Sequence, residues 1–241
     1  MPHRALKVVV FDFGDTLFQG ELDREGYTVA LLNYLRGLGY GVRERELNRA
    51  LKRALQKLGR VRVKNREMRF EDFYAMVLRS LRIPPEEEFL EGIYSTYTKC
   101  FKAKPVTNLE ASLRKLAGRY KLAVVSNSMS SLPREILEEA GLAPLFDAIV
   151  VSRDLGVRKP SPKIFRHVLK RLGVKPEEAV FVGDSVEADI MGAKRVGMKT
   201  VWVKRPGEKL VEEPDLVISS LEELPGALKT LEEGRTPSYL R

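Results

Sequence analysis

Short apolar runs recur along this chain, and most are followed by a polar turn and a segment with helical periodicity. Clear runs lie at 6–10, 122–125 and 179–182, with others at 148–151, 200–203 and 216–218. Runs that are rich in β-branched residues and apolar throughout are typical of strands buried on both faces of a parallel sheet. Helical patterns at 109–118, 133–141, 162–173, 186–197 and 220–233 separate them. The alternation predicts an α/β fold with right-handed crossovers.

Between the first two runs the pattern changes to apolar residues at helical spacing, with little sign of strands. Four stripes cover 27–38, 47–58, 73–81 and 89–101, and glycines or the Pro84-Pro85 pair separate them. Four amphipathic helices with short connections predict a small bundle. The bundle is therefore predicted as an inserted domain at 18–104, within a core domain formed by 1–17 and 105–241. The last residues, 234–241, are predicted to form a loose tail.

Composition is consistent with a globular protein that has a real core. The chain has 241 residues, of which 44% are hydrophobic, and no segment approaches the length of a membrane span. The single Cys100 excludes an internal disulfide and suits a reducing compartment. The amino terminus passes directly into a strand, which argues against a signal peptide. We therefore predict a cytoplasmic protein without a membrane partner.

The net charge of +9 is basic, and part of it is concentrated in the helical block. Six of the thirteen positions from 57 to 69, in a stretch interpreted as loop-like, are basic, and the only acid there is Glu67: Lys57, Arg60, Arg62, Lys64, Arg66, Arg69. Such a stretch indicates a nucleic-acid partner, an anionic substrate or a solvated surface. A nucleic-acid partner is disfavoured because no nucleic-acid-binding motif accompanies the charge.

Polar residues follow the predicted strands where those strands end. In an open parallel sheet, ligands bind beyond the carboxyl ends of the strands, so residues at these ends gather at one edge. The candidates are Asp12, Ser126, Asn127, Lys159, Asp184 and Asp189. Two or more carboxylates, one hydroxyl and one ammonium suit the handling of a phosphoryl group together with a divalent cation.

Each candidate also has a simpler interpretation. Asp12 is either a carboxylate that caps the next turn or one that attacks phosphorus. Ser126 and Asn127 either begin a turn or hold phosphate oxygens, and Lys159 is either solvated or a fixed cation near the phosphate. Close carboxylates repel each other unless a cation lies between them, and Mg²⁺ prefers such oxygen ligands.

Four segments in this order, with a helical insertion after the first, resemble the haloacid dehalogenase (HAD) superfamily with a C1-type helical cap. They are Phe11-Asp12-Phe13-Gly14-Asp15-Thr16, Ser126-Asn127, Lys159-Pro160, and Gly183-Asp184-Ser185 followed by Asp189. The resemblance covers nearly the whole chain. It implies a Rossmann-like core with an inserted helical-bundle cap that closes over the site.

The resemblance also implies roles for individual residues. Asp12 would be the nucleophile, Ser126 would bind the transferred group, and Lys159 would steady both. Asp12, Asp184 and the backbone carbonyl of Gly14 would bind Mg²⁺. Supporting roles would fall to Asp189 and Thr16.

One departure from the family pattern affects the proton transfers. The usual phosphatase segment is Asp-x-Asp-Gly-Thr, whose second Asp protonates the leaving oxygen and later activates water. Here Gly14 occupies that place and Asp15 follows it. Asp15 either takes over the acid–base role or is a turn residue, and a substrate with a good leaving group would need little protonation.

The leading hypothesis is a Mg²⁺-dependent phosphohydrolase that acts on a small phosphorylated metabolite through an aspartyl-phosphate intermediate. A 2-haloacid dehalogenase, in which Asp12 attacks carbon, is an alternative because such enzymes also lack the second Asp. Metal dependence separates the two. A third hypothesis is a weakly active protein whose basic cap binds a nucleic acid or an acidic protein. The sequence does not determine the oligomeric state or the particular substrate.

Overall fold

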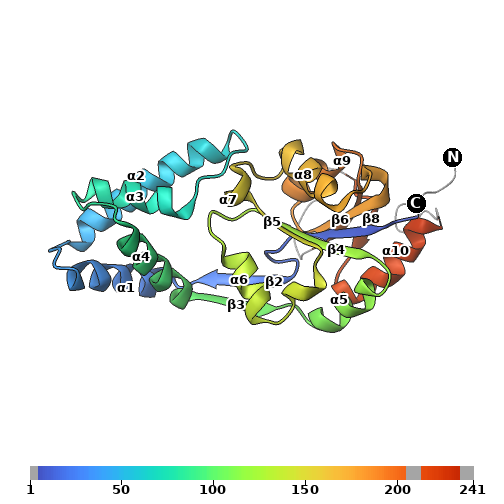
Figure 1. Cartoon of the computed structure of the whole chain (residues 1–241), viewed down its shortest axis with the longest axis horizontal. Helices are drawn as coiled ribbons and strands as arrows, with labels where there is room; N and C mark the ends of the chain where they lie inside the picture. Colours follow the sequence, from blue (N-terminus) through green and yellow to red (C-terminus); the bar gives the residue numbers. More distant parts are fainter. Residues whose placement is uncertain (1–4, 205–212, 234–241) are drawn as a thin grey trace.

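The computed structural model of the chain describes residues 5–204 and 213–233. A sheet covered by helices lies at one end of the long axis and a bundle of helices at the other (Figure 1). Residues 1–4, from which we predicted that no signal peptide is present, lie outside the described residues, as does the predicted tail at 234–241. None of the helices in the described ranges combines the length and apolar character needed to cross a bilayer.

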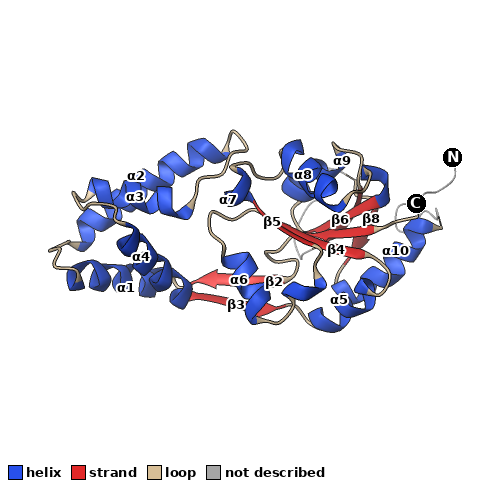
Figure 2. Cartoon of the chain, in the orientation of Figure 1, coloured by secondary structure: helices blue, strands red, loops and turns tan. Residues whose placement is uncertain are grey.

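The larger sheet has six strands, shown in red in Figure 2, and every neighbouring pair is parallel. Its order is β5-β4-β1-β6-β7-β8. The strands are β1 (Val8–Phe11), β4 (Lys121–Ser126), β5 (Ala148–Val151), β6 (Ala179–Gly183), β7 (Lys199–Val203) and β8 (Leu216–Ile218). The predicted parallel sheet is confirmed, and β1 lies in its interior with a neighbour on each side.

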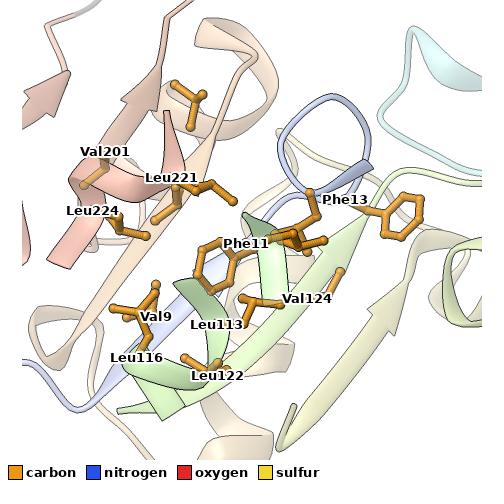
Figure 3. Packing of buried hydrophobic residues seen from close by; sticks show 14 of the residues in the cluster. Val9, Phe11, Phe13, Leu113, Leu116, Leu122, Val124, Val201, Leu221 and Leu224 are labelled. Atoms are coloured by element: carbon orange, nitrogen blue, oxygen red, sulfur yellow. The ribbon is translucent and has the colours of Figure 1, made fainter. Parts of the chain in front are cut away.

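Helices cover both faces of this sheet, which explains why its strands are apolar without alternation. On one face, Val9 and Phe11 pack against the helices below the sheet in Figure 1, and Figure 3 shows this packing. On the other face, Val8 and Val10 contact the remaining helices. The first face carries α5 (Leu109–Ala117), α6 (Leu132–Glu139) and α10 (Leu224–Glu232); the second carries α8 (Pro162–Leu172) and α9 (Gly192–Lys194).

The bundle has four helices, as the apolar stripes predict: α1 (Arg24–Gly37), α2 (Glu44–Arg62), α3 (Phe70–Ser80) and α4 (Glu87–Cys100). Each helix contributes a fully buried side chain to a separate apolar cluster: Leu35, Leu47, Leu78 and Ile93. Burying one such side chain contributes about 1.5–3 kcal/mol. The inserted bundle therefore has a core of its own, and the division at residues 17/18 and 104/105 stays a prediction.

A two-stranded antiparallel sheet connects the bundle to the core, and the sequence did not predict it. It pairs β2 (Phe18–Leu22) with β3 (Phe101–Pro105), so the interpretation of Phe101 as a helical residue is wrong. Both strands are short, and each is stabilised by a partner far away in the chain, which local periodicity cannot reveal. Gly20 lets the Phe101 ring approach closely, since an added Cβ would lie 2.6 Å from that ring.

Two other local predictions need correction. Gly59 does not end its helix, because α2 continues to Arg62, so half of the stretch interpreted as loop-like is helical. A glycine inside a helix costs only about 1 kcal/mol, and basic residues in the last turn favour the helix dipole. The helix predicted at 186–197 begins as a π-helical turn, Val186–Met191, which inserts an extra residue beside the candidate site. The remaining short elements are α7 (Ser152–Leu155) and single 3₁₀ turns at Ala143–Leu145, Pro176–Glu178 and Leu221–Glu223.

Candidate active site

The polar segments meet at the carboxyl edge of the large sheet. Asp12 directly follows β1, and its N–H donates to the Val182 carbonyl (2.9 Å), which holds it beside the end of β6. Ser126 is the last residue of β4 and is buried. Carboxylate oxygens of Asp12, Asp184 and Asp189 all lie within 4.8 Å of one another. Residues from distant parts of the chain therefore share one small volume.

Lys159 lies at the centre of this group and is only 2% exposed. Its Nζ is 2.5 Å from Asp12 Oδ1 and 2.7 Å from Asp189 Oδ1. Burial alone would lower the pKa of Lys159, but the charges of these two carboxylates outweigh burial, so the pKa is raised. The residue is a permanent cation that fixes one oxygen of Asp12.

Asn127 holds the backbone of Lys159 in place. Its Nδ2 donates to the Lys159 carbonyl (3.0 Å), and its Oδ1 accepts from the Lys159 N–H (2.8 Å). These bonds engage both polar groups of the amide side chain. A phosphate contact from Asn127 would therefore come from its backbone N–H, and the side chain positions the lysine.

Asp184 and Asp189 lie where ionisation is costly. Burial, and then the charges of Asp12 and Asp189, raise the pKa of Asp184 to about 7. Burial is also the main reason why the pKa of Asp189 is raised to about 6, despite its pairing with Lys159. Thr16 Oγ1 donates to Asp184 Oδ1 (3.3 Å), so Thr16 contacts the carboxylate cluster, and its supporting role stays a prediction.

Glycine is required where β6 meets Asp189. A Cβ added at Gly183 would lie 2.6 Å from the Asp189 Cβ, far inside van der Waals contact. Asp189 Oδ2 in turn accepts a hydrogen bond from the Ser185 N–H (3.1 Å). The Trp202 indole donates to the Asp184 carbonyl (2.7 Å) and anchors the backbone there. The loop after β6 is thus held by contacts within the core.

The charges of the group fit a divalent cation. Three carboxylates against one ammonium leave two negative charges when all are ionised. The donors are oxygens, which Mg²⁺ prefers, and a dication held among them would offset the repulsion between the carboxylates. Gly14 lines the cavity beside Asp12, so its backbone lies close to the same carboxylates.

Asp15 has the geometry of a turn residue. Its φ of 59° is left-handed, and its N–H donates to the Phe18 carbonyl (2.6 Å). Asp tolerates this conformation better than most residues do. The residue is exposed, and it also lines the cavity that contains Asp12. The acid–base role of Asp15 stays a prediction.

A cavity of about 540 Å³ lies between the core and the bundle, and Asp12, Asp189 and Lys159 line it. Tyr97 of α4 and Phe101 of β3 line it, together with two arginines. Arg62 ends α2, and Arg158 directly precedes Lys159. The sequence analysis did not identify either arginine as a site residue. A signal was present, however: Glu67 is the lone acid of the basic stretch, and it pairs with both arginines.

Comparison with known proteins identifies the family. Residues 6–197 match the model of the haloacid dehalogenase-like hydrolases. The chain belongs to this family. As a haloacid dehalogenase-like hydrolase it is an enzyme, and the resemblance inferred from the four segments is confirmed.

Relatives of this hydrolase include phosphatases. It is 35% identical over 205 residues to a glyceraldehyde 3-phosphate phosphatase of Methanopyrus kandleri, covering 83% of this chain and 84% of the relative. It is 41% identical over 117 residues to a phosphoserine phosphatase of Thermus thermophilus, covering 48% of this chain and 45% of that protein. The hydrolase therefore has curated relatives that act on different phosphate esters.

Solved structures of both chemistries share this fold. A 2-haloacid dehalogenase from Pseudomonas syringae pv. Tomato DC3000 superposes with a TM-score of 0.75 at 26% identity, covering 93% of this chain and 98% of that one. A HAD phosphatase from Thermococcus onnurineus superposes with a TM-score of 0.63 at 28% identity, covering 96% and 100%. The fold alone therefore does not decide between attack on phosphorus and attack on carbon, and the site must.

Proposed function

We propose that this hydrolase is a Mg²⁺-dependent phosphatase that acts on a small phosphorylated metabolite. The observation that carries the proposal is the cluster of three carboxylates within 4.8 Å of one another, two of which pair with one buried ammonium. The surplus negative charge favours a dication, which displacement at carbon does not need. The phosphatase names of relatives that match along most of the chain support the same conclusion.

The reaction would proceed in two steps at Asp12. One oxygen of Asp12 attacks phosphorus, the bond from phosphorus to the leaving oxygen breaks, and an aspartyl phosphate forms. Water then attacks phosphorus and releases inorganic phosphate and the free carboxylate. Lys159, held by Asn127, would orient Asp12 and neutralise the phosphate, and the Ser126 hydroxyl would hold a phosphate oxygen.

The residues that would hold Mg²⁺ are Asp12, Asp184 and the backbone carbonyl of Gly14. The ion would offset the negative charge of the phosphate and of the carboxylates, so that two anions can approach each other. Asp189 and Thr16 would support the site by fixing Lys159 and Asp184, respectively. In this proposal residues 18–104 form a cap domain that excludes water from the cavity. The cytoplasmic location stays a prediction.

The dehalogenase alternative is supported by the Pseudomonas syringae structure and by Gly14. The Pseudomonas syringae dehalogenase superposes closely, and a glycine at position 14 removes the second acid of the phosphatase segment. That chemistry would leave the carboxylate cluster of Asp12, Asp184 and Asp189 without a cation to bind. We therefore keep it as the second candidate.

The decisive experiment measures hydrolysis of p-nitrophenyl phosphate by the full chain with Mg²⁺, with a chelator, and in the Asp12→Asn variant. We expect turnover that needs Mg²⁺ and that falls to background in the variant. Asp72→Asn, at an exposed carboxylate of α3, is the matched control and should keep full activity. Halide release from 2-chloropropionate that is insensitive to the chelator would instead establish the dehalogenase.

A further inference from the structure

A buried carboxylate joins the bundle to the core beside the cavity. Glu67 lies between α2 and α3, and its side chain is 0% exposed. Its Oε1 accepts from Arg62 Nε (3.1 Å) and its Oε2 from Ser152 Oγ (3.0 Å), and Arg158 Nη1 lies 3.7 Å from the same Oε2. The Glu67 N–H donates to the Gly156 carbonyl (3.0 Å), which fixes the residue against the core.

The two arginines carry more charge than Glu67 neutralises. Two guanidiniums against one carboxylate leave one positive charge, and both arginines line the cavity. Their side chains are 34% and 20% exposed, so each is partly desolvated. Both guanidiniums contact the same carboxylate, so these two like charges lie close together; burial, and then the charge of Arg62, lower the pKa of Arg158. An anion bound to both would relieve the repulsion between these charges.

Guanidiniums are well suited to such an anion. Each has five N–H donors in a planar fork, so an arginine that gives one donor to Glu67 has others for a second carboxylate. Glu67 also restricts both side chains, which reduces the entropy lost when a ligand binds. The arginine pair thus has the donors and the charge to bind an anion in the same cavity that Asp12 and Lys159 line.

We propose that Arg62 and Arg158 bind a carboxylate of the substrate, so that the enzyme acts on phosphate monoesters of small hydroxy acids. This inference rests on the proposed function, because it takes the Asp12 and Lys159 end of the cavity as the phosphate end. Arg62, Arg158 and Lys159 line one cavity of about 540 Å³, so a single small molecule would present both of its anions within that volume. Glu67 is a positioning residue that holds the two arginines.

The alternative is that Glu67 and the arginines only fasten the bundle to the core. A matched pair of substrates separates the two cases: 3-phosphoglycerate, and glycerol 3-phosphate, in which a hydroxymethyl group replaces the carboxylate. We expect wild type to prefer 3-phosphoglycerate in kcat/KM by about ten- to a hundredfold, the range for hydrogen bonds to charged groups. The Arg62→Met and Arg158→Met variants should lose most of this preference, mainly through KM. A fastening role would lower turnover of both substrates equally.

Two further variants keep the test decisive. Arg60→Met removes an exposed arginine from the same turn of α2 and should keep the preference. Arg158→Lys keeps the positive charge but lacks the planar guanidinium, so it should retain an intermediate preference for 3-phosphoglycerate. This variant keeps the test usable if Arg158→Met does not fold. Equal kcat/KM for the pair in wild type would overturn the proposal.

Calorimetric titration of the same pair separates this inference from the proposed function. Tighter binding of 3-phosphoglycerate by wild type, lost in Arg158→Met, would support the arginine site even in a protein without phosphatase activity. Equal binding of both compounds would overturn the arginine site even if p-nitrophenyl phosphate is hydrolysed.

Discussion

Exchanging Gly14 and Asp15 tests whether the acid of the first segment is absent or merely displaced. The double variant Gly14→Asp/Asp15→Gly restores the order Asp-Phe-Asp-Gly-Thr. No heavy atom lies within 4 Å of a Cβ built at Gly14, so the backbone there leaves open space for a side chain. The left-handed φ of 59° at Asp15 suits glycine well. We therefore expect the double variant to fold, with a free energy of unfolding within about 1 kcal/mol of wild type.

The expected gain depends on the leaving group. A well-placed general acid contributes about 10²–10⁴-fold when the leaving oxygen is strongly basic. The alkoxide that leaves an alkyl phosphate is strongly basic and needs a proton, whereas p-nitrophenolate is weakly basic and leaves without one. Because Asp15 is exposed and lies in a turn, we expect the double variant to raise kcat for alkyl phosphates by about 10²-fold, the lower end of that range. The rate on p-nitrophenyl phosphate should change by less than about threefold, since protonation contributes little there.

The assay is kcat for a series of phosphate esters with increasingly basic leaving groups. The kcat of wild type should fall steeply along the series, and the kcat of the double variant should fall less. Asp15→Gly alone is the control and should lower the alkyl rates by less than about threefold, since a turn residue makes no proton transfer. A folded double variant with unchanged alkyl rates would refute the reasoning about position 14. A hundredfold loss in the control would assign the proton transfer to Asp15.

Two other predictions concern the charges of the site. Lys159→Met leaves Asp12 and Asp189 without their buried cation, so the free energy of unfolding of the metal-free protein in urea should fall by about 3–5 kcal/mol. Lys163→Met, at an exposed position of α8, is the control and should match wild type. Equal urea midpoints for the two variants would contradict this prediction. Because the pKa of Asp184 is raised to about 7, the stability that this group contributes is present in acid and is lost as the pH rises through about 7. Mg²⁺ binds the ionised form, so the apparent dissociation constant of Mg²⁺ should be about tenfold higher at about pH 6 than at about pH 8. The increase in Tm that Mg²⁺ produces should be correspondingly smaller at the lower pH. An equal increase in Tm at both pH values, in wild type and in Asp184→Asn alike, would exclude Asp184 as a ligand.

The sequence predicted the sheet and the convergence of polar residues, but it did not predict the small antiparallel sheet. Buried parallel strands have their own signature, because both faces are apolar, and their carboxyl ends necessarily meet at one edge. Phe18–Leu22 and Phe101–Pro105 lack that signature, since their stability comes from pairing across the whole helical insertion. Asn127 illustrates a subtler limit: its position at a strand end was predictable, but its pairing with the Lys159 peptide depends on how two loops approach each other.

The basic stretch from 57 to 69 illustrates why composition did not reveal the second anion site. Five of its six basic residues are exposed and consistent with a solvated surface, and only Arg62 lines the cavity. What separates Arg62 from its neighbours is Glu67, which is buried only because the bundle packs against the core at Ser152 and Gly156. Arg158 joins the same carboxylate from the core side. The packing of the bundle on the core therefore defines this pair of arginines. A count of charges along the sequence contains no information about that packing, so it predicts an exposed basic surface.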